Sequence, residues 1–195
     1  MSSISALKNT HIKGLFGDHE GKNENELLRL SELSDFLIIQ IVKYKKSSVL
    51  NQDIKIDNLS LNNETLTVSY NNHTRILWNG PNNWLLVSKK KEVLNEINEK
   101  LNETDFAITN LSHSRTIIQI EGKDTKEILK KGCPYNFNEL KNNNCLNSVY
   151  NGMSVTIDML SDKPDKVRIF TLRSFGESLY HSITDACLEF GYKSI

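Results

Sequence analysis

The feature that most constrains the fold is an apolar pattern near the end of the chain. Its apolar residues recur every three or four positions, at Phe175, Leu179, Ile183, Cys187 and Phe190. This is the spacing of one face of an α-helix. Ser174 and Glu177 stand at the spacing of a capping box before this run, and Gly191 follows it. The sequence therefore predicts a helix that starts at Ser174, ends at Gly191 and buries one face.

Short apolar segments separated by turn residues precede this helix. From Arg115 onward the predicted order is strand, helix, strand, strand, strand and helix. The strands cover residues 115–122, 146–152, 154–161 and 166–173, and the first helix runs from Asp124 to Gly132. This order predicts an α+β fold, in which helices pack on one face of mainly antiparallel sheets.

A similar but less regular order precedes residue 110. Strands are predicted over 35–44, 64–70, 74–80, 84–88 and 106–111, with a helix within 88–102. Two related α/β halves are therefore expected, 35–110 and 111–195, which can also form one compact unit. Residues 1–34 are mostly polar, so they are predicted to be a flexible N-terminal arm that a partner orders.

Charge and cysteine content exclude several classes of protein. The 24 basic and 24 acidic residues give a net charge of +0, so no basic field attracts nucleic acid or an anionic membrane. The longest apolar run, 36–42, is far shorter than the roughly 20 residues of a membrane span. The start of the chain lacks a signal-peptide pattern, and the three cysteines lack metal-ligand spacing. We expect a reduced, cytoplasmic protein without membrane or nucleic-acid partners.

The densest group of chemically active side chains is Ser112, His113, Ser114 and Arg115. One hypothesis makes a serine the nucleophile and His113 its base. In an extended segment, however, the two serines share one face while His113 points to the other. The Gly-x-Ser-x-Gly motif of a nucleophile elbow is also missing. The sequence therefore favours the second hypothesis, in which these residues make hydrogen bonds where a strand begins.

Two arginines and a tryptophan remain as candidates for molecular contacts. Arg115 and Arg173 stand at strand ends, where they can bind an anion or join a polar network or subunit contact. Trp84 follows a Gly-Pro turn and is interpreted as a core residue or an interface anchor. No catalytic, cofactor-binding or metal-binding residue is predicted. The predicted subunit-interface residues are Trp84, His113, Arg115 and Arg173.

Three segments of the chain resemble one protein family. Residues 76–88 (ILWNGPNNWLLVS), 110–138 (with Ser-His-Ser-Arg and Lys-Gly-Cys-Pro) and 170–191 (with Arg-Ser-Phe) are similar to segments of the gamma subunit of heterotetrameric sarcosine oxidase. They occur in the same order and spacing as in that family. This sequence departs from the family at Asn82-Asn83, where the family has an acidic pair, and at Tyr135-Asn136.

The resemblance implies a fold like that of the aminomethyltransferase (T-protein) group. It also implies a complex with alpha, beta and delta subunits that demethylates sarcosine to glycine, passes the one-carbon unit to tetrahydrofolate and produces hydrogen peroxide. FAD, FMN, NAD and tetrahydrofolate are then expected on the partner subunits, and none in this chain. The implied role of this chain is that of a non-catalytic structural subunit.

Other functions stay open at this point. The chain could be a stand-alone folate-binding protein, either an aminomethyltransferase relative or an iron–sulfur maintenance protein. Lys131-Gly132-Cys133 is superficially similar to a motif of the latter group, but the residues that follow it differ from that motif. The substrate of the implied complex could also be a related N-methyl amine, such as dimethylglycine.

Overall fold

The computed structural model describes residues 5–195, so the first four residues of the predicted arm lie outside the described part. The chain divides into two compact units. Of the described residues, unit 1 contains 5–34 together with Ser114–Ile195, and unit 2 is Asp35–His113. The first predicted half, 35–110, thus corresponds closely to unit 2. Residues before Asp35 belong to the same unit as the second half.

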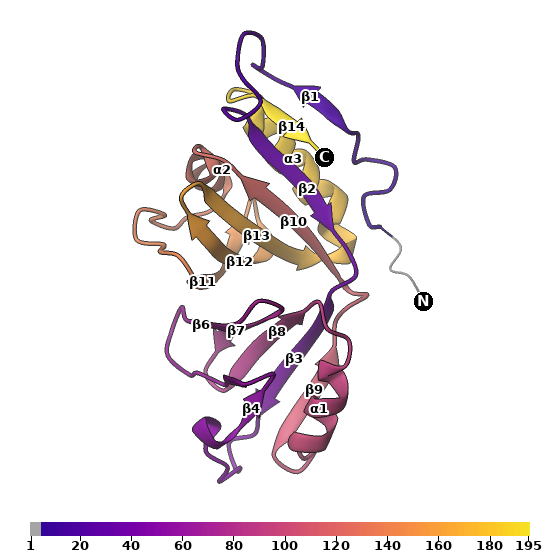
Figure 1. Cartoon of the computed structure of the whole chain (residues 1–195), viewed down its shortest axis with the longest axis vertical. Coiled ribbons are helices and arrows are strands. Elements are labelled where there is room, and N and C mark those ends of the chain that lie inside the picture. The colour runs from indigo at the N-terminus through magenta and orange to yellow at the C-terminus, as the bar shows by residue number, and fades with distance from the viewer. Residues whose placement is uncertain (1–4) are drawn as a thin grey trace. The chain divides into compact units, whose positions relative to one another are not determined.

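Unit 1 is built on a seven-stranded sheet with the order β1-β14-β2-β10-β13-β12-β11 (Figure 1). The strands are β1 (Gly14–Phe16), β2 (Leu28–Leu33), β10 (Arg115–Glu121), β11 (Cys145–Tyr150), β12 (Met153–Asp162), β13 (Asp165–Leu172) and β14 (Tyr192–Ser194). Neighbouring strands are antiparallel except β14 and β2, which are parallel.

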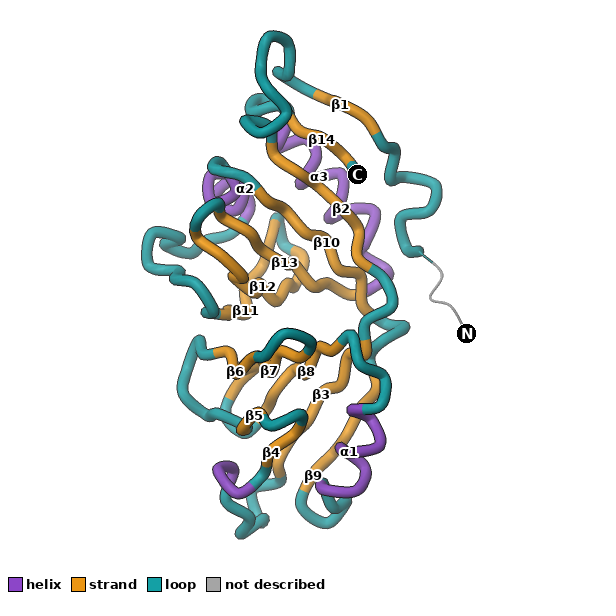
Figure 2. Tube along the Cα trace, in the orientation of Figure 1, coloured by secondary structure: helices purple, strands orange, loops and turns teal. Residues whose placement is uncertain are grey.

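The helices of unit 1, α2 (Thr125–Gly132) and α3 (Gly176–Cys187), cover one face of this sheet (Figures 1 and 2). Strand pairing through β13 places Thr116 of β10 and Val155 of β12 on the same face. Tyr150 of β11 shares that face, and its hydroxyl donates a hydrogen bond of 3.0 Å to the carbonyl oxygen of Ile128 in α2. Gly176, where α3 begins, lies against the Thr116 side chain. This arrangement confirms the predicted α+β fold class.

Unit 2 contains a five-stranded antiparallel sheet with the order β6-β7-β8-β3-β9. Its strands are β3 (Leu37–Lys43), β6 (Val68–Tyr70), β7 (Thr74–Gly80), β8 (Asn83–Ser88) and β9 (Phe106–Asn110). A short ribbon is formed by β4 (Lys55–Ile56) and β5 (Leu59–Ser60), after the 3₁₀ turn η1 (Asn51–Asp53). One hydrophobic core contains Ile39 and Trp84 together with residues of helix α1 (Val93–Lys100). The helix contributes Val93 and Ile97, and its C-cap residue Leu101 also belongs to this core. The helical spacing of these residues explains which face of α1 is buried.

The last helix starts later than predicted, whereas α1 begins inside the predicted range of 88–102. Ser88 is the last residue of β8, and its hydroxyl accepts a hydrogen bond from the Lys90 amide, so α1 begins only at Val93. Residues 173–175 form a 3₁₀ turn, η2, and the Arg173 amide donates to the carbonyl oxygen of Ser114, just before β10. Helix α3 therefore begins at Gly176, with no hydrogen bond from a capping side chain.

The prediction of a flexible arm over 1–34 differs from the structure for the described residues. Strand β2 lies between β14 and β10 inside the sheet of unit 1. Leu28 and Leu30 are 1% and 0% exposed, and Leu7 is also fully buried. Burial of these leucines stabilises the segment, because each buried aliphatic side chain contributes about 2 kcal/mol. The polar residues around them conceal this short apolar alternation in the sequence.

Two glycines bring the N-terminal loop against the end of α3. The Asp18 amide donates to the carbonyl oxygen of Leu188 at 2.8 Å. Gly17 and Gly191 have φ of +70° and +72°, which L side chains rarely adopt. A Cβ on Gly17 would lie 2.2 Å from the Leu188 carbonyl oxygen, and one on Gly191 would lie 2.3 Å from that of Asp18. This close backbone contact therefore requires glycine on both sides.

Candidate functional site

Trp84, one of the four predicted interface residues, lies in the core of unit 2. Its side chain is 0% exposed, and its indole N–H donates to the carbonyl oxygen of Asn62 at 2.6 Å. Both the apolar ring and the polar N–H are therefore satisfied within the chain. This burial favours the core interpretation of Trp84 over the interface interpretation.

The other three predicted interface residues are His113, Arg115 and Arg173. Arg115 is half-buried at the start of β10, and Arg173 follows the end of β13. The Arg173 amide donates to the carbonyl oxygen of Ser114 at 2.9 Å, so the fold brings both arginines to the same end of the unit 1 sheet. His113 is exposed and is the last residue of unit 2.

Ser112 has a structural role at the start of a strand. Its hydroxyl oxygen accepts a hydrogen bond of 3.0 Å from the amide of Ile38 in unit 2. Its own amide donates to the side-chain oxygen of Asn110. The hydroxyl thus satisfies a backbone donor of β3. This geometry supports the hypothesis of a hydrogen-bonding strand start rather than that of a nucleophile.

The three cysteines are free and buried in unit 1. Burial raises the pKa of the Cys187 thiol to about 12. Burial also raises the pKa of Cys133, whose thiol donates to the hydroxyl of Ser148. A nucleophilic or metal-binding cysteine needs its thiolate, which these environments disfavour. Within residues 5–195, no three His, Cys, Asp or Glu side chains gather as a metal site, and no helix is long and apolar enough to cross a membrane.

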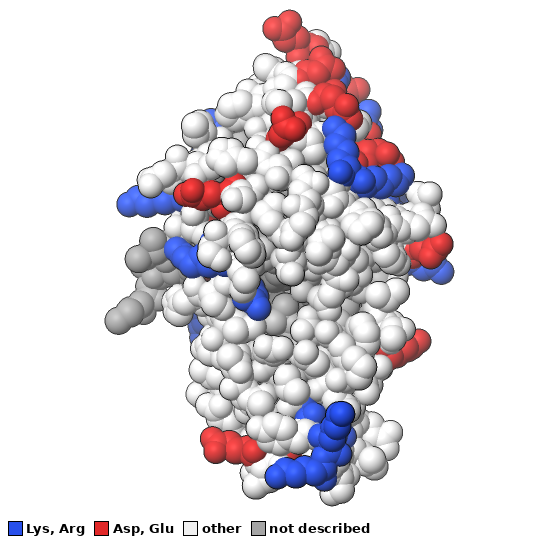
Figure 3. Space-filling view, turned by 180° about the vertical axis from the view of Figure 1, so that it is seen from behind, with Lys and Arg blue, Asp and Glu red and all other residues white. Residues whose placement is uncertain are grey.

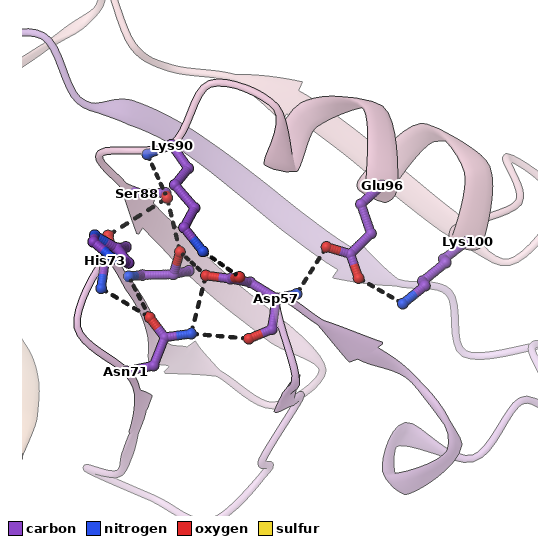
Figure 4. A network of polar contacts seen from close by, with 8 residues as sticks. Asp57, Asn71, His73, Ser88, Lys90, Glu96 and Lys100 are labelled. Carbon is purple, nitrogen blue, oxygen red and sulfur yellow. Dashed lines mark hydrogen bonds and ion pairs between the residues drawn. The ribbon is translucent and has the colours of Figure 1, made fainter.

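The densest polar cluster of unit 2 is centred on Asp57 (Figure 4). The Asp57 carboxylate accepts hydrogen bonds from the Thr74 hydroxyl at 2.6 Å, the Asn71 amide nitrogen at 3.0 Å and the Lys90 ammonium at 2.9 Å. Asp57 has a φ of +49° in the turn between β4 and β5, a conformation that Asp tolerates. These contacts tie that turn to the hairpin of β6 and β7.

The cluster continues toward helix α1. The Asp57 amide donates to Glu96 at 2.9 Å, and Glu96 in turn pairs with Lys100 (Figure 4). The Thr74 and Ser88 hydroxyls are 2.7 Å apart. The carboxylate of Asp57 is thus occupied by donors from its own chain, which favours a structural role over ligand binding. Sequence reasoning missed this cluster because its members are scattered between residues 57 and 100.

We predict that ionisation of Asp57 makes the stability of the protein depend on pH. Burial raises its pKa, but hydrogen bonds from Thr74, Asn71 and Lys90 outweigh burial and lower it to about 2, below about 3.9 in the unfolded chain. The stabilisation is therefore present above pH ~4 and is lost as the pH falls toward ~2. Asp57→Asn should cost about 1–2 kcal/mol at pH 7, with Lys90 partly exposed. Urea unfolding followed by tryptophan fluorescence checks this.

The matched control is Asp53→Asn, because Asp53 is exposed in η1. We expect this variant to match the wild type at every pH. The cost of Asp57→Asn should shrink as the pH is lowered from about 4 toward 2, following the linkage between protonation and stability. A cost that is the same at pH 7 and pH ~2.5 would contradict the assignment of the charged carboxylate as the stabilising group.

A hollow of about 600 Å³ lies in unit 2. It is lined mainly by amide and hydroxyl side chains: Asn51, Gln52, Ser60, Asn62, Asn63, Ser69 and Asn82, with Leu50, Leu61 and Lys43. The Lys43 ammonium already donates to the Val49 carbonyl and to Asn51. The lining thus contains no pair of side chains suited to act as nucleophile and base.

Several surface charges form local ion pairs. On the face drawn in Figure 3, basic and acidic side chains lie next to one another rather than in one broad patch of a single sign. In unit 1, Lys130 pairs with Glu127 at 2.7 Å and Lys131 with Glu189 at 2.8 Å. Such exposed pairs contribute little to stability, typically below about 1 kcal/mol each. They do reduce the electric field that this face presents to a charged ligand.

Comparison with sequences of known proteins gives a consistent result. Residues 54–189 match the model of the sarcosine oxidase, gamma subunit family. Sarcosine oxidase subunit gamma of Corynebacterium sp. (strain U-96) is 27% identical over 120 residues. These residues are 60% of this chain and 58% of that protein, so the chain aligns with less than two thirds of the length of this relative.

Comparison with solved structures supports the fold. A chain of the heterotetrameric sarcosine oxidase from Corynebacterium sp. U-96, solved in complex with pyrrole 2-carboxylate, has a TM-score of 0.77 at 21% identity, covering 86% of this chain and 87% of that one. The glycine cleavage system aminomethyltransferase T from Bartonella henselae has a TM-score of 0.60 at 13% identity, covering 82% and 46%. At such low identity these likenesses show a shared fold, and they confirm the predicted aminomethyltransferase-like architecture.

Proposed function

Because the chain belongs to the sarcosine oxidase, gamma subunit family, we propose that it is a structural, non-catalytic subunit of a heterotetrameric sarcosine oxidase. The family match over residues 54–189 is the observation that carries this proposal. The partners are then the alpha, beta and delta subunits. The complex would demethylate sarcosine to glycine, transfer the one-carbon unit to tetrahydrofolate and produce hydrogen peroxide. A cytoplasmic location, expected from the sequence, is part of the same proposal.

The chemistry of the described residues supports a non-catalytic role. The hydroxyl of Ser112 is bonded to backbone, the Asp57 carboxylate is held by its own donors, and the buried Cys187 thiol resists ionisation. We therefore assign FAD, FMN, NAD and tetrahydrofolate to the partner subunits as part of this proposal. No step of the reaction is attributed to this chain.

The Lys-Gly-Cys segment has a packing explanation. A Cβ on Gly132 would lie 2.6 Å from the ring of Tyr150, which packs directly over the glycine. Cys133 is buried, and Lys131 donates to the carbonyl oxygen of Ala186 at 2.8 Å. Each residue thus serves the contact between α2 and its neighbours, which weakens the alternative of an iron–sulfur maintenance protein. The fold shared with aminomethyltransferase T keeps folate binding as the alternative to test.

The proposed function is tested by co-expressing this chain, carrying an affinity tag, with the alpha, beta and delta subunits encoded in the same genome. We expect the tagged chain to retain the three partners, flavin absorbance and sarcosine-dependent peroxide production. The same measurement with dimethylglycine identifies the preferred N-methyl amine. Failure of the partners to co-purify would overturn the proposal.

The control is the purified chain alone. We expect no amine turnover and no calorimetric heat with FAD, FMN, NAD or tetrahydrofolate. Tetrahydrofolate binding with a Kd below about 10 μM, which corresponds to roughly 7 kcal/mol, would instead favour the stand-alone folate protein. Turnover of sarcosine by the lone chain would contradict a non-catalytic role.

A further inference from the structure

The first described residues of unit 1, 5–11, form a turn that packs against the start of helix α3. The amide of His11 donates to the carbonyl oxygen of Leu7 at 2.8 Å, which closes the turn. The Leu7 side chain is 0% exposed and anchors the turn in the interior. A Cβ on Gly176, where α3 begins, would lie 3.4 Å from that of Ala6. We call residues 5–11 the N-terminal strap.

One carboxylate of the sheet holds the strap. Glu32 of β2 accepts a hydrogen bond of 2.9 Å from the Ala6 amide through one oxygen and another from the Ser5 hydroxyl through the other oxygen. Strand β2 lies inside the sheet, so this acceptor has a fixed position. The strap is joined to β1 by Ile12 and Lys13, which are both exposed. The strap can therefore open around these two residues while β1 stays paired with β14.

His11 is the side chain of the strap that can respond to pH near neutrality. Its ring packs edge-on against the ring of Tyr180 in α3, with 5.5 Å between the ring centroids. Its Nε2 atom is buried and has no hydrogen-bond partner within residues 5–195. Protonation adds a charge and makes both ring nitrogens donors, so Nε2 would then be a buried donor without an acceptor. Protonation of His11 therefore disfavours the closed strap.

The groups around His11 determine the direction of this effect. Burial lowers the pKa of His11 below its usual 6.5 and is the largest contribution, while Glu32 raises the pKa and Lys13 lowers it. Tyr180 stays neutral because burial raises the pKa of its phenol, and the ring of His181 lies 6.4 Å from that of Tyr180. A released His11 returns to water and takes up a proton near pH ~6.5. The closed strap is thus favoured above pH ~6.5 and is lost as the pH falls through the lowered pKa.

We propose that the N-terminal strap is a pH-dependent clasp, which is closed at neutral pH and opens in mild acid, with His11 as the group that takes up the proton and Glu32 as the contact that holds the closed form. The inference does not rest on the proposed function, because every part of the clasp lies in unit 1. Opening would bring Leu7 into water, together with the ring of Tyr180, which is 4% exposed in the closed form. The chain would thus present additional apolar surface only in mild acid.

The test measures amide hydrogen exchange of the purified full chain by NMR at pH 7.5 and 5.5, with each rate divided by the intrinsic rate at that pH. The amides of Ala6 and His11 are hydrogen-bonded in the closed strap and report its opening. Their protection should fall by about three- to tenfold at the lower pH, because uptake of one proton changes the opening equilibrium by at most about tenfold per pH unit. Amides of β10, in the same unit, should keep their protection.

Three variants separate the proton from the packing. His11→Phe keeps an aromatic ring against Tyr180 but takes up no proton, so strap protection should be the same at both pH values. Glu32→Gln removes the carboxylate that accepts from two donors of the strap, so it should lower protection at both pH values and leave the pH response in place. The matched control is His181→Gln, because His181 is an exposed histidine beside the same tyrosine. It should respond to pH as the wild type does.

Two results with the wild type and His11→Phe would overturn the inference. These are equal strap protection of the wild type at both pH values, and an undiminished pH response in His11→Phe. Loss of the pH response in His181→Gln would assign the proton to α3 and overturn it as well. If phenylalanine does not pack at this position, His11→Gln decides, since it also takes up no proton and should show lower protection that is the same at both pH values.

Discussion

Replacing Gly191 with alanine is expected to destabilise unit 1 by about 3–4 kcal/mol. Part of this cost arises because Gly191 has a φ of +72°, which costs an L residue about 1–2 kcal/mol. The larger part arises because the new Cβ would lie 2.3 Å from the carbonyl oxygen of Asp18 and 3.0 Å from Leu27. Backbone cannot rotate away as a flexible side chain can, so the N-terminal loop must move off the end of α3.

The matched control is Gly152→Ala in the turn between β11 and β12. Gly152 has a similar φ of +82°, but a Cβ there meets nothing within 4 Å. Gly152→Ala should therefore cost only the strain of an L residue at positive φ, about 1–2 kcal/mol. All three cysteines are buried in unit 1, so thiol labelling in urea reports the opening of this unit. Equal costs for the two variants would show that the close contact of the N-terminal loop with α3 is not required.

Strand pairing between distant parts of the sequence explains why the strand within residues 1–34 was not predicted. Strand β2 is only six residues long, and the neighbouring residues are polar. Its place in the sheet is set by pairing with β10 and β14, both distant in sequence, and local patterns do not encode such pairing. The longer helices and strands were predictable because they repeat their apolar spacing over several turns or pleats.

The sequence predicted only those features of the candidate site that depend on the position of a residue next to a strand. Arg115 and Arg173 stand next to clear strand patterns, so their place at strand ends followed from the sequence. The cluster around Asp57 depends on turns and on strand pairing, and only the structure reveals it. Trp84 was ambiguous because a tryptophan beside a turn serves equally well as a core residue or as an interface anchor.

Trp84→Ala should lower the stability of unit 2 by about 4 kcal/mol, within the range for truncation of a buried aromatic residue. The side chain is 0% exposed within the core of this unit, so its removal leaves a large cavity. The indole bond to the Asn62 carbonyl is lost as well, at a cost of about 1 kcal/mol or more. Urea unfolding followed by the fluorescence of Trp78, which lies in the same unit, measures the loss.

Two further variants separate a core role from an interface role for Trp84. Trp84→Phe keeps most of the apolar volume and should cost clearly less than Trp84→Ala, because the cavity is smaller. Tyr70→Ala removes an aromatic ring that is 51% exposed and should change stability by less than about 1 kcal/mol. If Trp84→Ala left the lone chain as stable as the wild type and weakened only subunit binding, the tryptophan would be an interface anchor. Loss of stability without any partner present would place it in the core.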